Sequence, residues 1–279
     1  EAGVFAPSFV SIGDLFAGAL IPGLLLVLGY GIYVVLFASS RPDDVPSNKE
    51  LILEQDRGKM LINVAKGLLP PVTLVLAVLG SILKGVATPT EAASVGAVGA
   101  ILLAIIKGNI SFNVLQEVSL ETMRTTSMIY LILIGATIFS SVFRGFGGED
   151  LIESFLTALP GGILSATFVV MVFIFLLGFI LDFIEITFMV VPLVGPVLLG
   201  MGIDPIWLGV MIAINLQTSF LTPPFGFSLF YLRSVLPDTI DTSQIYRGVA
   251  PFIVIQILIL LLIALQPGIA TWLPSYFQR

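Results

Sequence analysis

Neutral polar side chains cluster in the second half of the sequence, immediately before two consecutive prolines. The cluster consists of Asn215, Gln217, Thr218, Ser219 and Thr222. Pro223 and Pro224 have no backbone N–H to donate, and the residue before them is pushed toward an extended conformation, so a helix must break here. Carbonyl groups freed inside a membrane bundle are costly unless they are coordinated, and neutral oxygens are hard ligands that suit sodium. The stretch is the best candidate ion site in the chain, and the alternative is a structural proline kink.

Two acidic residues interrupt a long apolar stretch farther upstream. Residues 168–181 are strongly apolar, Asp182 and Glu185 follow, and apolar residues resume from 186 to 199, divided again by Pro192, Gly195 and Pro196. A charged group at membrane depth costs about 3 kcal/mol or more, so it should face protein or water there. We interpret the pattern as two half-helices that meet in a re-entrant hairpin with its tip near Asp182 to Thr187. The alternative is an ordinary helix end from which both acids reach the interface.

The composition determines which elements must position these residues. Of the 279 residues, 57% are hydrophobic and 11% are charged, and the mean hydropathy is +1.09, which is too apolar for a water-soluble domain. Several apolar stretches are long enough to cross a hydrocarbon core of about 30 Å, and none alternates with the period of a membrane barrel. The sequence therefore predicts an all-α polytopic membrane protein.

Two absences narrow the chemistry. The sequence has no His and no Cys, which excludes imidazole relays, thiolate metal sites and disulfides. Only Asp182 and Glu185 could act as an acid/base pair, so we expect no catalytic residues, no enzyme activity and no organic cofactor. The net charge is −6 without a dense basic run, so we expect no nucleic-acid partner.

The expected spans divide the chain into three regions. Region 1–66 contains a span at 15–37, opened by Asp14, and a loop from 39 to 66 whose positive charge predicts a cytoplasmic location. Region 67–144 contains a span at 67–83 opened by prolines, a helix through residue 106 that is capped by Thr88 or Thr90, an amphipathic interfacial helix at 111–126 and a span at 128–143. Region 145–279 contains an acidic connection on the outer side, the hairpin, the broken helix and a final span at 249–265.

The chain begins at Glu1 without the pattern of a signal peptide, so we expect it to start within a longer product. Transporters are often built from two inverted repeats with the substrate between them. Part of a two-repeat site is then expected outside this sequence.

Several motifs resemble those of one transporter family. They are Ala87-Thr-Pro-Thr-Glu-Ala-Ala93, Leu181-Asp-Phe-Ile-Glu-Ile186, Asn215-Leu-Gln-Thr-Ser-Phe-Leu-Thr-Pro-Pro-Phe-Gly226 and Leu229-Phe-Tyr-Leu-Arg233. They are similar to the large membrane subunit of tripartite ATP-independent periplasmic (TRAP) transporters. The resemblance implies a multi-pass protein of the bacterial or archaeal inner membrane with an inverted-repeat, elevator-type fold. It also implies sodium-coupled import of a small organic acid, such as a dicarboxylate or a sugar acid, with a small membrane subunit and a periplasmic binding protein as partners, in contact with membrane lipid.

The resemblance places residues 182–187 at the second hairpin and residues 219–226 in its unwound partner. The candidate sodium-binding residues are Ser219, Thr222, Gly226, Asp182 and Thr187. The candidate substrate-binding residues are Asn215, Gln217, Thr218, Pro223, Pro224 and Arg233. An interfacial anchor is the alternative role for Arg233. An ion channel or a membrane-embedded enzyme remains the alternative function, although the sequence has no repeated filter-like motif.

Overall fold

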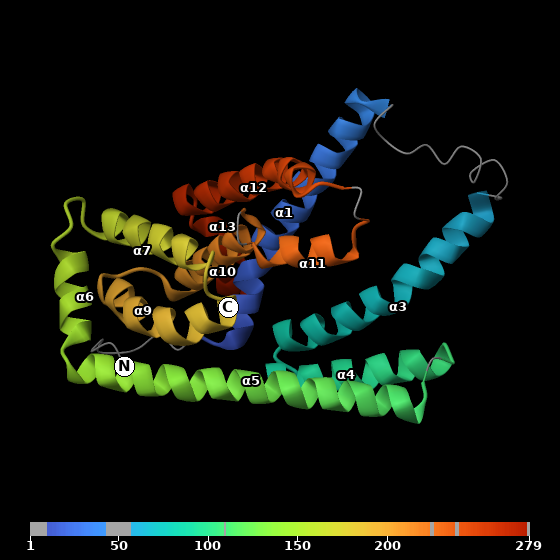
Figure 1. Ribbon diagram of the computed structural model, residues 1–279, viewed down its shortest axis with the longest axis horizontal. Coiled ribbons are helices and arrows are strands. Elements are labelled where there is room, and N and C mark those ends of the chain that lie inside the picture. Colours follow the sequence, from blue (N-terminus) through green and yellow to red (C-terminus); the bar gives the residue numbers. More distant parts are fainter. Residues whose placement is uncertain (1–9, 43–56, 109, 224–225, 238–239, 278–279) are drawn as a thin grey trace. The chain divides into compact units, whose positions relative to one another are not determined.

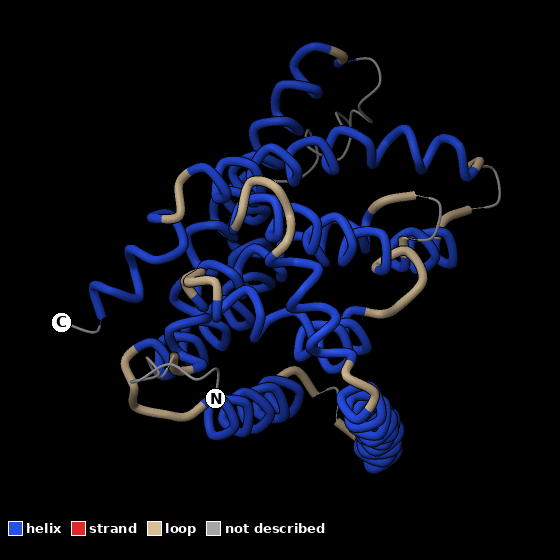
Figure 2. Tube along the Cα trace, turned by 90° about the vertical axis from the view of Figure 1, so that its left-hand side faces the viewer, coloured by secondary structure: helices blue, strands red, loops and turns tan. Residues whose placement is uncertain are grey.

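The computed structural model describes residues 10–42, 57–108, 110–223, 226–237 and 240–277 (Figure 1). Helices make up nearly all of these residues, and the described part of the chain contains no strand (Figure 2). The expected all-α class is therefore confirmed. Capping residues explain where two of the helices begin: Ser11 and Asp14 form a capping box at the helix that starts at Ile12, and Thr88 and Glu91 form one at the helix that starts at Pro89.

The helices fall into two compact units. One unit includes Gly18–Leu26 and Glu121–Arg279, and the other includes Ser11–Ala17 and Val27–Leu120. In chain order, the first helices are α1 (Ile12–Ser40), which contributes to both units, α3 (Arg57–Leu83), α4 (Pro89–Ile106) and α5 (Phe112–Gly145), which passes from one unit into the other after Leu120. The following helices are α6 (Gly148–Thr157), α7 (Ile163–Leu177), α8 (Phe183–Glu185), η2 (Ile186–Val190), α9 (Val191–Gly200), α10 (Pro205–Leu221), α11 (Phe227–Val235), α12 (Thr242–Leu265) and α13 (Gly268–Phe277).

Six described helices are long and apolar enough to cross a membrane. They are Ile12–Ser40, Ile62–Leu83, Pro89–Ile106, Phe112–Gly145, Phe183–Gly200 and Thr242–Leu265. Two shorter apolar helices, α7 and α10, complete the set. Large apolar side chains along these helices are exposed at the surface of the chain, which fits a protein whose solvent is lipid. The expected multi-pass membrane fold is confirmed.

The expected start of the second span is wrong. The helix of the second span begins at Arg57, so Pro70 and Pro71 lie inside α3 and not at its start. Residues 57–66, which the sequence placed in a loop, are therefore helical. Membrane helices tolerate internal proline when other groups satisfy the carbonyls that proline leaves without a donor. The rest of the expected basic loop, from residue 43 to residue 56 and including Lys49, lies outside the described residues.

The expected interfacial helix is not separate from the span that follows it. The helix α5 runs without a break for 34 residues from Phe112 to Gly145. Its first 22 residues contain neither Gly nor Pro, so nothing in the sequence ends the helix near residue 126. A helix of this length extends about 51 Å, which exceeds a hydrocarbon core of about 30 Å.

Helix α10 lies at the centre of the unit that contains residues 121–279. It packs against α7, α11, α12 and α13. The indole Nε1 of Trp207 donates a hydrogen bond of 2.9 Å to the carbonyl of Ile263 on α12. Gly18 of α1 packs so closely that an added Cβ would lie 2.6 Å from Ile206 and 2.9 Å from the carbonyl oxygen of Ala270. These contacts hold α10 among its neighbours.

Candidate ion and substrate site

Helix α10 ends at the predicted break. Its N-terminus is capped by Asp204, whose carboxylate accepts a 2.9 Å hydrogen bond from the N–H of Trp207. At its other end Thr222 is extended, with φ −89° and ψ 127°, as expected before a proline. A new helix, α11, begins at Phe227. The predicted break between two helical segments is confirmed.

Gly226 allows the chain to turn back at this break. An added Cβ would lie 2.8 Å from the carbonyl oxygen of Phe220 and 3.0 Å from that of Thr222. These neighbours are backbone atoms, which cannot rotate away as the end of a side chain could. The position therefore requires glycine, which gives Gly226 a defined structural role at the break.

Helices α7 and α9 form the two arms of a hairpin, and residues 178–182 form its turn. Asp182 begins the second arm, where its carboxylate accepts a 2.7 Å hydrogen bond from the N–H of Phe183. Glu185 completes the capping box by accepting from the N–H of Asp182 at 3.3 Å. Both acids are thus used at a helix start, where the helix dipole favours negative charge.

The second arm is not divided by its prolines, which corrects the sequence interpretation. It continues as helix from Phe183 to Gly200, with a wider turn at Ile186–Val190 just before Pro192. In that turn the N–H of Val191 bonds to the carbonyl of Ile186, five residues back. Such π turns insert one residue into a helix and are frequent at functional sites.

The structure brings the hairpin turn and the end of α10 together. Gly178 of the turn lies against Ser219, since an added Cβ would be 2.1 Å from the Ser219 Oγ and 2.7 Å from its Cβ. The rings of Phe183 and Phe220 meet edge to face with centroids 6.3 Å apart. Below them, the amide of Asn215 donates a 2.8 Å hydrogen bond to the carbonyl of Met171 on α7.

The hydroxyl groups on α10 donate their hydrogens within the helix. Thr218 donates to the carbonyl of Ile214 at 2.8 Å, Ser219 to that of Leu216 at 2.9 Å, and Thr222 to that of Thr218 at 2.7 Å. Thr218 and Ser219 are each 1% exposed. A hydroxyl that donates its hydrogen still carries lone pairs that can coordinate a cation. These groups are therefore chemically suited to bind sodium.

The remaining candidates lie in less enclosed positions. Thr187 is exposed, and its hydroxyl donates to the carbonyl of Phe183 at 2.7 Å. Gln217 is exposed on the opposite side of α10 from its buried neighbours, and Pro223 is half-buried at the break. Arg233 donates to the carbonyl of Ile240 at 2.6 Å and so ties α11 to the segment before α12. Pro224 lies outside the described residues.

Two residues of this site were missed by the sequence analysis. Gly178 permits the close approach of the turn to α10, and the Met171 carbonyl accepts the buried amide of Asn215. A glycine inside an apolar stretch, four residues before an acidic cap, is a signal that could have identified Gly178. Nothing in the sequence marks the carbonyl of Met171.

The donor set of the described residues is neutral. These residues include no group of three or more acidic side chains that could hold a metal ion, and the sequence has no His or Cys. Transition-metal ligation therefore has no candidate among the described residues. What the geometry offers is hydroxyl and backbone oxygens beside a broken helix.

A broken helix packed against a helical hairpin, within a bundle of apolar helices, defines a polytopic membrane protein built on discontinuous helices. Residues 3–269 match the family described as "Tripartite ATP-independent periplasmic transporter, DctM component". The chain therefore belongs to this family, whose members are large permease subunits, and it is a multi-pass protein of the inner membrane.

The chain is similar to several curated members of the family. It is 30% identical to the sialic acid TRAP transporter large permease protein SiaM of Vibrio cholerae, over 97% of this chain and 61% of that protein. It is 28% identical to the C4-dicarboxylate TRAP transporter large permease protein DctM of Pseudomonas aeruginosa, over 97% of this chain and 62% of that protein. The chain thus spans about three fifths of the length of these relatives. Both are named as transporter permeases and not as enzymes.

Proposed function

We propose that this chain supplies the hairpin and broken helix of a sodium-coupled permease that imports a small organic acid. The observation that carries the proposal is the contact between Gly178 in the hairpin turn and Ser219 at the end of α10. The hydroxyl of Ser219 at the end of the broken helix meets the turn of the hairpin there, and two discontinuous elements that meet in this way hold coupling ions in transporters with broken helices. The Vibrio and Pseudomonas relatives are named for sialic acid and for C4-dicarboxylates, and both substrates carry carboxylate groups.

Sodium binding would favour substrate binding because both ligands require the same part of the protein to be ordered. An ion beside Ser219 and Thr222 would draw the hairpin turn and the broken helix into one arrangement. The carboxylate substrate would then meet a site that the ion and the start of a helix have made more positive. Because the first ligand has ordered the site, the second binds with a smaller entropic cost.

The capping pair supports the same arrangement. Asp182 and Glu185 fix the start of the second hairpin arm, so the backbone of the turn is held in place. We assign them a positioning role and retain Asp182 and Thr187 as candidates for contact with the ion. Asn215 holds the first arm to α10, and Arg233 holds the segment that follows α11.

The partners belong to the same proposal. The full-length subunit would act with a small membrane subunit and with a periplasmic protein that delivers the acid. Movement of the hairpin and α10 relative to a fixed part of the protein would expose the site to each side of the membrane in turn, as in an elevator.

The test is uptake of labelled acids into liposomes that contain the full-length subunit, its small subunit and its binding protein. We expect accumulation to require an inward sodium gradient and to fall in Thr222→Val, which keeps the shape but removes the hydroxyl. The matched control is Thr137→Val, since the Thr137 hydroxyl makes the same type of bond, 2.8 Å to the carbonyl of Leu133, far from the break in sequence. Accumulation without sodium would refute the coupling, and passive equilibration alone would favour a channel.

A further inference from the structure

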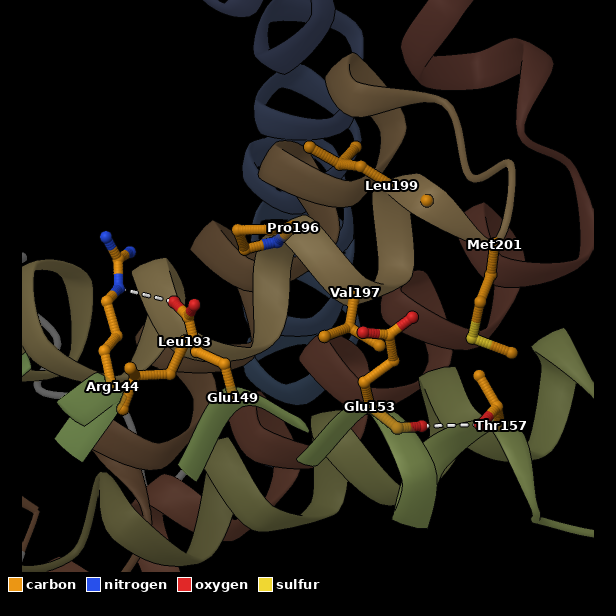
Figure 3. Close-up of a pocket in the computed structure, with 10 residues that line it drawn as sticks. Arg144, Glu149, Glu153, Thr157, Leu193, Pro196, Val197, Leu199 and Met201 are labelled. Atoms are coloured by element: carbon orange, nitrogen blue, oxygen red, sulfur yellow. Dashed lines mark hydrogen bonds and ion pairs between the residues drawn. The ribbon is translucent and has the colours of Figure 1, made fainter. Parts of the chain in front are cut away.

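A cavity lies at the end of the hairpin that is remote from its turn. It has a volume of about 710 Å³, and it lies open to the surroundings between α6 with the end of α5 on one side and α9 on the other (Figure 3). The candidate ion site lies near residues 178–182, whereas the cavity is lined by residues of α9 and its C-terminal end between positions 193 and 201. The cavity is therefore separate from the candidate ion site.

One wall of the cavity is charged. It is formed by Arg144, Glu149, Glu153 and Thr157. The Nε of Arg144 is paired with the carboxylate of Glu149, and this bond leaves the two terminal nitrogens of the guanidinium outside the pair. Figure 3 shows Glu149 and Glu153 pointing from α6 toward α9. Within the described part of the chain, the Glu153 carboxylate has no ion-pair partner. The wall thus offers the carboxylate of Glu153 and, farther along, a guanidinium at Arg144 that can still donate.

The opposite wall is apolar. It is formed by Leu193, Pro196, Val197, Leu199, Gly200 and Met201. Gly200 is the last residue of α9, so the carbonyl end of that helix, where the dipole is negative, faces the same cavity. The three ionised side chains of the cavity carry one positive and two negative charges, a net charge of −1. A ligand with a cationic group and an apolar portion complements these walls.

We propose that this cavity binds a phospholipid whose headgroup carries a primary ammonium. The ammonium would donate to Glu153, the phosphate would accept from the terminal nitrogens of Arg144, and the glycerol and upper acyl chains would lie against α9. Charged side chains at the ends of membrane helices lie at the level of lipid headgroups, which favours a lipid over a water-soluble ligand. Leu151 and Phe155 support this, since both are exposed apolar residues on α6.

Such a lipid would connect α6 to the second arm of the hairpin. The two helices contact each other in the structure, and Leu156 of α6 is buried with 3% exposure. A headgroup held between them would add charge-assisted hydrogen bonds to this contact. Occupancy of the cavity would therefore stabilise the hairpin arm at the end away from the ion site.

The test is lipid retention by the purified full-length subunit, measured by native mass spectrometry in detergent. The probes are phosphatidylethanolamine, phosphatidylcholine, which has no N–H donor, and phosphatidylglycerol, which has no ammonium. We expect preferential retention of phosphatidylethanolamine, and we expect Glu153→Gln to weaken it by about fivefold, the equivalent of roughly 1 kcal/mol. Asp150→Asn is the matched control, because Asp150 is exposed on the same helix and does not line the cavity.

A second variant tests the apolar wall without changing any charge. Gly200 has open space around its Cβ position, so Gly200→Leu can fill the cavity without a backbone clash. We expect this variant to fold and to lose the preference for phosphatidylethanolamine. Equal retention of the three lipids, or unchanged retention in both variants, would overturn the proposal. Displacement of the lipid by soluble glycerophosphoethanolamine would assign the cavity to a water-soluble zwitterion and would overturn the lipid assignment.

Discussion

Gly178 is the residue on which the contact between hairpin and broken helix depends most directly. Its Cβ position lies 2.1 Å from the Oγ of Ser219, and rotation of that hydroxyl does not relieve the overlap because the Ser219 Cβ is 2.7 Å away. Overpacking of this kind costs about 1–3 kcal/mol. We therefore expect Gly178→Ala to reduce sodium-dependent uptake by roughly tenfold, measured in the liposome assay.

The matched control for this substitution is Gly135→Ala on α5, where nothing lies within 4 Å of the Cβ position. The double variant Gly178→Ala with Ser219→Gly removes the overlap and should regain thermal stability, but it should not regain uptake if Ser219 is an ion ligand. Normal uptake in Gly178→Ala would show that the close approach is not needed for transport.

Asn215 joins two elements through one buried hydrogen bond. It is 2% exposed, and its amide donates to the Met171 carbonyl at 2.8 Å. Loss of a buried hydrogen bond costs about 1–3 kcal/mol. We expect Asn215→Leu to lower the midpoint of thermal unfolding in detergent, whereas Gln217→Leu, on the exposed side of α10, should change it little. An equal effect of the two substitutions would contradict the role of this bond in stability.

At the scale of elements, the break between α10 and α11 follows from proline chemistry. In Pro223→Ala combined with Pro224→Ala, two backbone N–H donors return, and alanine is favoured over proline in a helix by about 3 kcal/mol per residue. We expect α10 to extend toward α11. The measurement is hydrogen exchange of residues 219–226, which should slow, together with uptake, which should be lost.

Pro251→Ala is the control for this change, since Pro251 lies inside the unbroken helix α12. It should leave both the exchange of residues 219–226 and the uptake unchanged. Fast exchange that persists in the double alanine variant would mean that contacts other than the prolines maintain the break.

The elements that the sequence predicted well are those determined by local chemistry. The break after Leu221 follows from proline chemistry, and the helix start at Thr88 follows from its capping residues. The continuity of α5 and the early start of α3 were not predicted. Apolar periodicity alone cannot locate the end of a helix in a stretch that has no helix-breaking residue. The pairing of Gly178 with Ser219 joins residues far apart in sequence, and no local pattern encodes such a contact.

At the scale of the whole molecule, counting the membrane crossings assigns each charged segment to one side of the membrane. If residues 39–66 are cytoplasmic, α3 crosses outward, α4 crosses inward and α5 crosses outward again. The segment around Lys107 is then cytoplasmic, and the acidic segment around α6 is outside. Both ends of the hairpin then lie on the outer side, and α10 and α11 together cross inward. Arg233 and Arg247 are therefore on the cytoplasmic side, as the positive-inside rule expects.

This topology gives a prediction that does not depend on transport. In a cysteine-free version of the full-length subunit, we expect Ser154→Cys on α6 to react with a membrane-impermeant maleimide in intact cells. Lys107→Cys should react only after the membrane is permeabilised, because the connection between α4 and α5 faces the cytoplasm. Both positions are exposed in the chain, so a difference in labelling reports the side of the membrane and not burial. Labelling of both residues from outside would place the connection between α4 and α5 on the outer side and would contradict the path described for these two helices.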